Sequence, residues 1–332
     1  MKVAVVGAGL IGQAWAIVFA RGGCEVSLWD GNSRALDNVV PGIARRLSDL
    51  KDHGLVSDVD EVLKRLQATS SLADALAGSH YVQENLPEVL ELKAEIFGRM
   101  DALAPGGAIL ASSTSGFPAS AFTQGLAGRQ RCLIAHPVNP PYLIPVVELC
   151  GAPWTSPAAI EGARSLMDSI GQRPVVVKRE IDGFILNRLQ GALLQEAFWL
   201  VENGYVDAAG LDATVSEGLG LRWAFMGPIE TIDLNAPSGL SDYCQRYGGM
   251  YQSFEQSPNS RQMGQGWSAE LVETLNGQRR ETLPISELAD RQAWRDRRLM
   301  QLMVHKQQAV YAEDVTKPSP EAECGRQAVG TS

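Results

Sequence analysis

Short runs of apolar and β-branched residues alternate with helical stretches along the first half of the chain. The alternation continues to about residue 178, and its apolar runs read VAVVG, EVSLWD, HYVQEN, GAILASS, RCLIAHP, VVELC and PVVVKR. Strands that alternate with helices are typical of a parallel, doubly wound sheet. The pattern therefore predicts an α/β fold of the Rossmann type. Within it, Gly106-Gly107 predicts the end of the helix that precedes the run GAILASS.

Long amphipathic helices replace this alternation from Asp182 onward, and no strand pattern returns. Two of them read FILNRLQGALLQEAFWLVENG and RQAWRDRRLMQLMVHKQQAV. We therefore expect a doubly wound sheet domain over residues 1–179, an all-α C-terminal domain over 180–316, and a disordered polar tail over 317–332. The runs FILNRLQGALL and LRWAFMGPIETIDL carry more apolar surface than one helical layer can bury, which predicts a homodimer through the helical domain.

Bulk composition narrows the classes of function. The chain has 332 residues and a formal net charge of −9 at pH 7, which argues against nucleic-acid or anionic-membrane partners. Its apolar runs are shorter than a membrane span, and the first strand begins at once, so we expect no signal peptide and a cytoplasmic protein. The cysteines lack CxxC spacing and histidine neighbours, so we expect neither a disulfide framework nor a metal site. They are Cys24, Cys132, Cys150, Cys244 and Cys324.

The first twelve residues, MKVAVVGAGLIG, place the motif G-x-G-x-x-G directly after an apolar strand. Gly7 permits a tight turn, Gly9 allows close approach of a pyrophosphate, and Gly12 lets the following helix pack on the sheet. Leu10 and Ile11 belong to the predicted cofactor site because they begin that helix, whose N-terminus offers unpaired amides and a positive dipole end. The motif predicts a bound dinucleotide.

Asp30 ends the second apolar strand, EVSLWD. An acid at this position accepts hydrogen bonds from the adenosine ribose and repels the 2′-phosphate of NADP, which predicts NAD as the cofactor. Arg34 lies close to Asp30 in the sequence, so NADP remains an alternative cofactor.

A dehydrogenase also needs a proton acceptor, and histidine is the usual one. His53 and His80 stand in polar, loop-like contexts, and His305 lies on a charged helix. His136 ends the strand CLIAH, which places it at the carboxyl edge of the sheet, where ligands bind in such folds. A structural, hydrogen-bonded histidine is the alternative interpretation.

Three further residues support His136 as a catalytic candidate. Ser115 lies in the turn STSG, also at the carboxyl edge, although a turn serine is the simpler interpretation. Glu148 follows His136 by twelve residues, so a hairpin or short return would bring its carboxylate to the second imidazole nitrogen. Asn187 stands on an otherwise apolar helix and needs a hydrogen-bonding partner, which a substrate oxygen would supply.

Taken in order, the segments STSG, HPVNPP, VVEL and GFILNRL after the glycine motif resemble the 3-hydroxyacyl-CoA dehydrogenase superfamily. The segments HPVNPPYLIPVVEL, SEGLGLRWAFMGPIETIDLNAPSGLSDYCQRYG and WRDRRLMQL are similar to the λ-crystallin branch, whose enzymatic member oxidises L-gulonate. The resemblance implies an NAD-binding domain first and a helical substrate and dimerisation domain second.

The resemblance also implies roles for individual residues. Ser115 would donate a hydrogen bond to the substrate hydroxyl, His136 would be the general base, Glu148 would orient and support the imidazolium, and Asn187 would position the reacting oxygen. Asn139 and Glu84 match family positions near the nicotinamide and its loop, and Lys93 matches a lysine that in relatives approaches the cofactor or the substrate.

The substrate is the least determined part. The resemblance implies oxidation of L-gulonate to 3-dehydro-L-gulonate. HPVNPP stands where fatty-acyl relatives have HFFNP, which favours a small polar substrate over a coenzyme A thioester. Arg222 would clamp a carboxylate, with a structural ion pair as an equal alternative. Three alternatives remain. The substrate could be a 3-hydroxyacyl-CoA, or the protein could be a non-catalytic, crystallin-like NAD-binding protein. A carnitine-type substrate would be held by aromatic faces, for which the candidates are Tyr142, Trp223 and Phe225.

Overall fold

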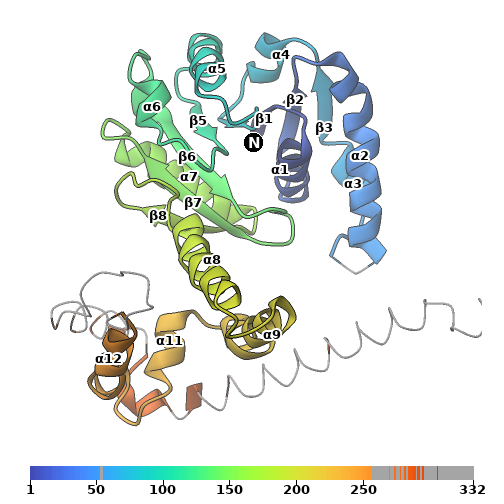
Figure 1. The fold of residues 1–332 in the computed structure, drawn as a ribbon. Coiled ribbons are helices and arrows are strands. Elements are labelled where there is room, and N and C mark those ends of the chain that lie inside the picture. Colours follow the sequence, from blue (N-terminus) through green and yellow to red (C-terminus); the bar gives the residue numbers. More distant parts are fainter. Residues whose placement is uncertain are drawn as a thin grey trace, which may run out of the picture. The chain divides into compact units, whose positions relative to one another are not determined.

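The computed structural model describes residues 1–52 and 55–255 and, beyond them, positions 269, 273, 277, 280–281, 283–288, 290–291, 294 and 305. The chain divides into two compact units, Met1–Ala192 and Leu193–Ser332. His53, Cys324 and the expected disordered tail lie outside the described residues. Helix α8 begins in the first unit and continues into the second (Figure 1).

An eight-stranded sheet forms the first unit, in the order β3-β2-β1-β4-β5-β6-β7-β8 (Figure 1). Strand β1 is parallel to both of its neighbours, β2 and β4. The chain runs from β1 outward to β2 and β3 and then returns to β4 on the other side of β1. The carboxyl ends of β1 and β4 therefore form a topological switch point, where such folds bind ligands. The predicted α/β fold is confirmed. The strands are β1 (Lys2–Val6), β2 (Glu25–Trp29), β3 (Leu66–Thr69), β4 (Tyr81–Glu84), β5 (Ile109–Ser112), β6 (Cys132–Pro137), β7 (Val146–Gly151) and β8 (Arg173–Val177).

Three details of the sheet correct the sequence-based expectation. The sheet is not wholly parallel, because β6 and β7 are antiparallel and joined by the short segment 138–145. Strand β3 was not predicted, since its sequence LQAT is a short edge strand with no buried residue. The helix before β5 ends at Leu103 rather than at the glycines, because Ala104 is extended ahead of Pro105, as a residue before proline prefers.

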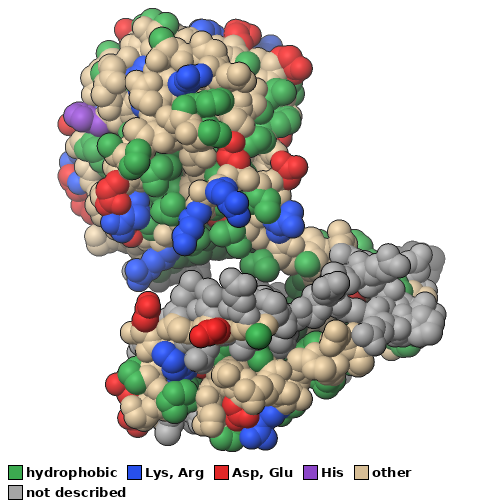
Figure 2. Space-filling view, turned by 90° about the vertical axis from the view of Figure 1, so that its left-hand side faces the viewer, with side chains coloured by type: hydrophobic (Ala, Val, Ile, Leu, Met, Phe, Trp, Pro, Cys, Tyr) green, Lys and Arg blue, Asp and Glu red, His purple; other side chains and the backbone are tan. Residues whose placement is uncertain are grey.

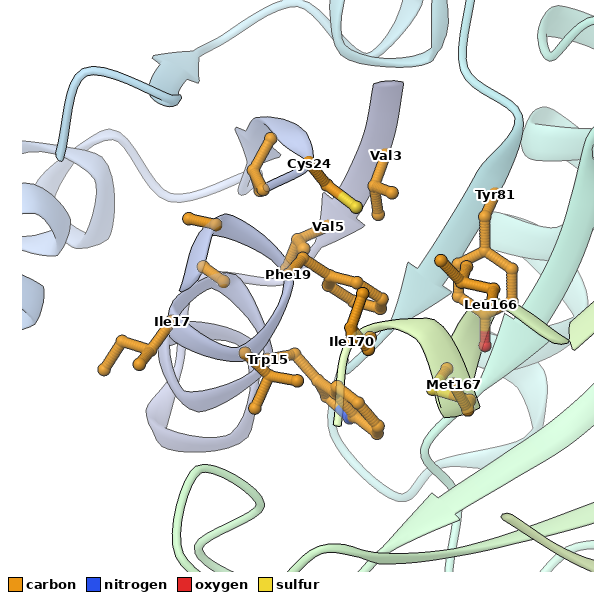
Figure 3. Packing of buried hydrophobic residues seen from close by; sticks show 14 of the residues in the cluster. Val3, Val5, Trp15, Ile17, Phe19, Cys24, Tyr81, Leu166, Met167 and Ile170 are labelled. Carbon is orange, nitrogen blue, oxygen red and sulfur yellow. The ribbon is translucent and has the colours of Figure 1, made fainter. Parts of the chain in front are cut away.

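Helices cover both faces of the sheet and bury two apolar clusters. Alternation along β1 directs Val3 and Val5 to one cluster and Ala4 and Val6 to the other. Figure 3 shows the first cluster, in which Trp15 and Phe19 of the first helix lie near Tyr81, Leu166 and Ile170. The helices are α1 (Leu10–Arg21), α2 (Ser33–Asp52), α3 (Val59–Leu63), α4 (Leu72–Leu76), α5 (Leu90–Leu103), α6 (Ser120–Thr123), the 3₁₀ turn η1 (Arg129–Arg131) and α7 (Pro157–Ser169).

The described elements of the second unit are all helices or helical turns, as predicted. Met226, Leu234, Leu283 and Leu288 form its buried apolar cluster. Of the described helices in the whole chain, none is long and apolar enough to cross a membrane. The elements are α8 (Leu186–Glu202), α9 (Ala208–Ala213), the π-type turn η2 (Thr214–Leu219), α10 (Gly220–Trp223), α11 (Pro228–Asp233), α12 (Leu240–Glu255) and the 3₁₀ turn η3 (Ile285–Glu287).

Candidate active site

The glycine-rich turn between β1 and α1 has the shape of a phosphate cradle. Gly7 has a φ of 99°, which side chains rarely adopt, and a Cβ atom on Gly12 would lie 1.8 Å from the Gly7 carbonyl oxygen. A Cβ atom on Gly9 would meet nothing within 4 Å, so the space beside the N-terminus of α1 is open. Leu10 and Ile11 begin the helix, and Leu10 is exposed. These residues fit a dinucleotide pyrophosphate.

Asp30 lies beside this turn and holds it in place. Its Oδ2 atom accepts a hydrogen bond from the Ala8 amide at 2.8 Å, and its Oδ1 atom accepts one from the Asn32 amide at 2.8 Å. Each carboxylate oxygen has a second lone pair, which leaves acceptors for ribose hydroxyls. Arg34 lies in the first turn of α2, with its side chain exposed.

His136 and Glu148 face each other across the antiparallel strands β6 and β7. The Nδ1 atom of His136 lies 2.9 Å from Oε2 of Glu148, and both side chains are buried. A carboxylate only accepts hydrogen bonds, so in the neutral imidazole this contact favours the tautomer with the proton on Nδ1 and the free lone pair on Nε2. The register of the strand pair therefore sets the tautomer that a general base requires.

The second oxygen of Glu148 is also occupied. Oε1 accepts hydrogen bonds from the backbone amides of Ile185 at 2.8 Å and Leu186 at 3.0 Å, where α8 begins. Burial raises the pKa of Glu148, but the hydrogen bonds from His136, Leu186 and Ile185 outweigh it and hold the pKa below its usual value. Glu148 is therefore ionised at neutral pH and joins the imidazole to the start of α8.

The structure also brings Ser115 and Asn187 together. Nδ2 of Asn187, in the first turn of α8, donates to the Ser115 carbonyl oxygen at 3.3 Å. Ser115 is exposed in the turn that follows β5. The contact links the turn STSG to the helix whose N-terminus Glu148 holds, so all four catalytic candidates belong to connected segments of the first unit.

Glu84 and Lys93 form a buried ion pair behind this turn. Their closest nitrogen–oxygen distance is 3.3 Å, and Glu84 also accepts from the Leu86 amide at 2.6 Å and the Ser112 hydroxyl at 2.5 Å. Burial raises the pKa of Glu84, and Lys93, Ser112 and Leu86 offset part of that rise. Lys93 is only 1% exposed and also donates to the Leu86 carbonyl oxygen at 3.3 Å, so the pair ties β4 and α5 to the loop between them, and its predicted place near the nicotinamide stays a prediction.

Glu88 is a functional candidate that the sequence interpretation missed. Its Oε1 atom accepts from the Gly116 amide at 2.9 Å and from the Thr114 hydroxyl, and its Oε2 atom lies 3.4 Å from Nζ of Lys93. Burial raises the pKa of Glu88, but these hydrogen bonds and the lysine lower it below its usual value. Glu88 lies in the connection between β4 and α5, four residues after Glu84, and no local sequence pattern marks it as functional.

The remaining predicted residues lie apart from this cluster or in the second unit. Asn139 is exposed in the loop after β6 and precedes a cis peptide bond to Pro140. Arg21 donates to the Tyr142 carbonyl oxygen of that loop at 3.2 Å. Arg222 lies on α10 in the second unit, half-buried, and its role stays a prediction.

The other histidines and cysteines lie outside the cluster. His80, just before β4, and His305 are exposed. Burial raises the pKa of Cys132 and of Cys150 to about 12, which keeps these thiols protonated. Within the described ranges no three His, Cys, Asp or Glu side chains group as metal ligands would.

Comparison with known proteins assigns the family. The family model for "3-hydroxyacyl-CoA dehydrogenase, NAD binding domain" matches residues 2–181, and the model for the C-terminal domain of the same family matches residues 183–270. The chain belongs to the 3-hydroxyacyl-CoA dehydrogenase family. It is accordingly an NAD-dependent dehydrogenase, with the cofactor domain first, as the glycine motif predicts.

Individual relatives narrow the branch. Lambda-crystallin of Oryctolagus cuniculus is 41% identical over 92% of this chain and 96% of its own. L-carnitine dehydrogenase of Streptomyces griseus subsp. griseus is 40% identical over 74% of this chain and 73% of its own. Among solved structures, an NAD+-dependent 5-dehydrogenase of a formyl-hydroxy-methylpyridine carboxylic acid has a TM-score of 0.68 at 28% identity, covering 89% of this chain and 98% of that one. The resemblance to the λ-crystallin branch is confirmed.

Proposed function

We propose that this protein oxidises the 3-hydroxyl group of a small hydroxy acid with NAD, and that His136 takes the hydroxyl proton. The observation that carries the proposal is the 2.9 Å contact between His136 and Glu148 at the carboxyl edge of the sheet. A base for alcohol oxidation must present a free lone pair to the hydroxyl group in a defined tautomer, and a buried imidazole whose Nδ1 faces a carboxylate meets this condition.

Each of the four residues has a distinct part in this proposal. Nε2 of His136 accepts the hydroxyl proton, and ionised Glu148 stabilises the resulting imidazolium. The Ser115 hydroxyl donates to the reacting oxygen, and the Asn187 amide positions that oxygen from the start of α8. Gly7, Gly9, Gly12 and Asp30 would hold the dinucleotide. When bound, NAD supplies the hydride acceptor.

The substrate that we favour is L-gulonate, which would make the protein an L-gulonate 3-dehydrogenase. Two observations support this choice: the 41% identity to a lambda-crystallin over nearly the whole chain, and the sequence HPVNPP after β6 in place of two aromatic residues. Arg222 would bind the carboxylate. We further propose a cytoplasmic homodimer, supported by the apolar residues Leu189 and Phe198, which α8 leaves 62% and 67% exposed.

Two other substrates of the same reaction have support. The 40% identity to an L-carnitine dehydrogenase favours a quaternary ammonium substrate. A coenzyme A thioester is the second: Figure 2 shows several Lys and Arg side chains gathered along the lower edge of the first unit, and such a cluster suits phosphate groups even in a chain of acidic net charge. The sequence of the loop after β6 is the stronger argument for a free acid.

A substrate panel tests the proposal. The full-length protein is mixed with NAD and, separately, with L-gulonate, 3-hydroxybutyrate, 3-hydroxybutyryl-CoA and L-carnitine, and NADH formation is followed by absorbance. The highest kcat/KM is expected with L-gulonate. A clear preference for L-carnitine or for the thioester would make that compound class the substrate in place of L-gulonate. NAD binding without turnover of any hydroxy acid would support a non-catalytic role. Light scattering that gives a monomer mass at micromolar concentration would reject the dimer.

A further inference from the structure

Phe184 combines a left-handed backbone with a fully buried aromatic side chain. Its φ is 49°, and it is the one non-glycine residue with a positive φ in the part of the chain that the structure describes. Its side chain is 1% exposed. The left-handed region is sterically unfavourable for a bulky residue, and such conformations persist where surrounding contacts hold them, often at functional sites.

The left-handed backbone of Phe184 sets how the next residues meet Glu148. Gly183 is also left-handed, with a φ of 77°, and the Phe184 amide donates to the Ile181 carbonyl oxygen at 3.1 Å. These two residues turn the chain into α8 so that the consecutive amides of Ile185 and Leu186 both point at Oε1 of Glu148. The turn therefore fixes the carboxylate whose other oxygen holds His136.

The ring of Phe184 contacts the imidazole itself. The centroids of the Phe184 and His136 rings are 5.4 Å apart, and the ring planes are inclined by 35°. The hydrogen bond to Glu148 restrains the imidazole at one edge, but a bond at one edge still allows the ring to tilt. A buried aromatic ring packed beside the imidazole at this distance restricts that tilt and so sets the direction of Nε2.

We propose that Phe184 is a positioning residue for His136, acting through the ring contact and through the turn that directs two amides onto Glu148. The inference rests on the proposed role of His136 as the proton acceptor. A base that is present but wrongly oriented gives a lower kcat, because proton transfer requires hydrogen-bond geometry between the base and the substrate.

The alternative is that Phe184 only fills the core, since it belongs to the buried cluster that also contains Phe97. Phe97 offers a matched control. It is fully buried in the same cluster and packs against Phe122 with ring centroids 4.8 Å apart. Replacing either phenylalanine with leucine removes the same atoms from the same core.

The experiment compares Phe184→Leu, Phe97→Leu, His136→Ala and the double variant of Phe184→Leu with His136→Ala in the full-length protein. Steady-state kinetics use the hydroxy acid of the panel with the highest kcat/KM, and NAD affinity and Tm are measured for each variant. We expect Phe184→Leu to lower kcat about tenfold or more, with NAD affinity unchanged. Phe97→Leu should lower Tm similarly and leave kcat within about twofold. In the His136→Ala background, Phe184→Leu should cause no further loss, because its effect passes through the histidine.

Two outcomes would overturn the proposal. One is an equal loss of kcat in Phe184→Leu and Phe97→Leu, and the other is a full additional loss when Phe184→Leu is added to His136→Ala. Full turnover by His136→Ala alone would instead reject the proposed function, which keeps the two failures distinguishable. If Phe184→Leu does not fold, Phe184→Met fills the space without a ring and carries the same expectation, while Phe184→Tyr retains the ring and should rescue kcat to within a few-fold of the wild type.

Discussion

His136 and Glu148 are directly opposed residues of the antiparallel pair β6–β7, and their side chains meet at 2.9 Å on the buried side of that pair. Successive residues of a strand point to opposite faces, so a shift of one residue in this register would turn Glu148 away from the imidazole. Such a shift would also have to change the pairing of the whole ladder, which runs from Leu133 opposite Gly151 to Pro137 opposite Val147. Strand pairing therefore brings the imidazole and the carboxylate together, and the turn before α8 holds the other oxygen of Glu148.

Removal of the imidazole tests the role of His136 directly. We expect His136→Ala to lower kcat by about 10²–10⁴-fold, the usual range for a positioned proton acceptor, with NAD affinity near that of the wild type. Glu148→Gln should lower kcat less. The amide keeps the shape of the side chain but lacks the negative charge that would stabilise the imidazolium. Steady-state kinetics measure both variants, and a His136→Ala enzyme that retains most of its turnover would contradict the assignment.

The pH dependence of stability tests the network around Glu148. The pKa of Glu148 in the folded protein lies below its usual value of 4.5, because hydrogen bonds outweigh the effect of burial. Such a carboxyl group stabilises the fold fully above its unfolded pKa, and this contribution is lost as the pH falls through the folded pKa. Glu148→Gln should therefore lower Tm at pH 7, and the difference from the wild type should shrink below about pH 4.5.

Thermal unfolding followed by circular dichroism at pH 7, 5 and 3.5 measures this difference. Glu95→Gln, on the exposed face of α5, is the control and should leave Tm nearly unchanged at every pH. A Glu148→Gln deficit that is the same at pH 7 and pH 3.5 would show that packing, and not the carboxylate charge, accounts for it.

The sequence allowed the prediction of the parts of this site that depend on local patterns. The strand runs and the turn of Gly7 to Gly12 follow from local hydrophobicity and from steric demands on glycine, so they could be placed from the residues alone. The spacing of twelve residues between His136 and Glu148 suggested a hairpin, and the structure has one. The contacts of Glu148 with α8 could not be predicted, because they depend on the left-handed backbone of Phe184, a conformation that phenylalanine does not signal.

Longer-range contacts account for the other omissions. Glu88 reaches the Ser115 turn across a separation of 28 residues, and nothing in its local sequence distinguishes it from a solvated acid. The glycines after α5 were a misleading signal, because Pro105 ends that helix first. The helix end is a local effect that the sequence already contained, whereas the contacts of Glu88 arise only when the carboxyl ends of β4 and β5 are brought side by side.

Cofactor selectivity tests Asp30. We expect kcat/KM with NAD to exceed that with NADP at least tenfold, or about 1.4 kcal/mol, because the carboxylate accepts ribose hydroxyls and repels a 2′-phosphate. Asp30→Asn removes the charge while keeping one acceptor for the Ala8 amide, and it should reduce this preference. Kinetics with both cofactors measure the ratio. Equal efficiency in the wild type would show that Arg34 compensates for the acid.

Arg222 tests whether the substrate is a free acid. A guanidinium binds a carboxylate through two parallel hydrogen bonds, and loss of such a charged contact costs about 1.5–3 kcal/mol. Arg222→Ala should therefore raise KM for L-gulonate severalfold or more, with a smaller change in kcat. Arg222→Lys should recover part of the affinity, because lysine keeps the positive charge but cannot make the two parallel hydrogen bonds.

The opposing interpretation of Arg222 is a structural ion pair, and it has a different signature. A structural role predicts a lower Tm for Arg222→Ala with KM for L-gulonate unchanged, and it would leave the carboxylate without an assigned partner. Kinetics with 3-hydroxybutyryl-CoA complete the test, since this substrate presents a thioester where L-gulonate presents a carboxylate. A far higher kcat/KM with the thioester would remove the reason for a carboxylate clamp. The proton-transfer role of His136 would be unaffected, because the same secondary hydroxyl group is oxidised in both substrates.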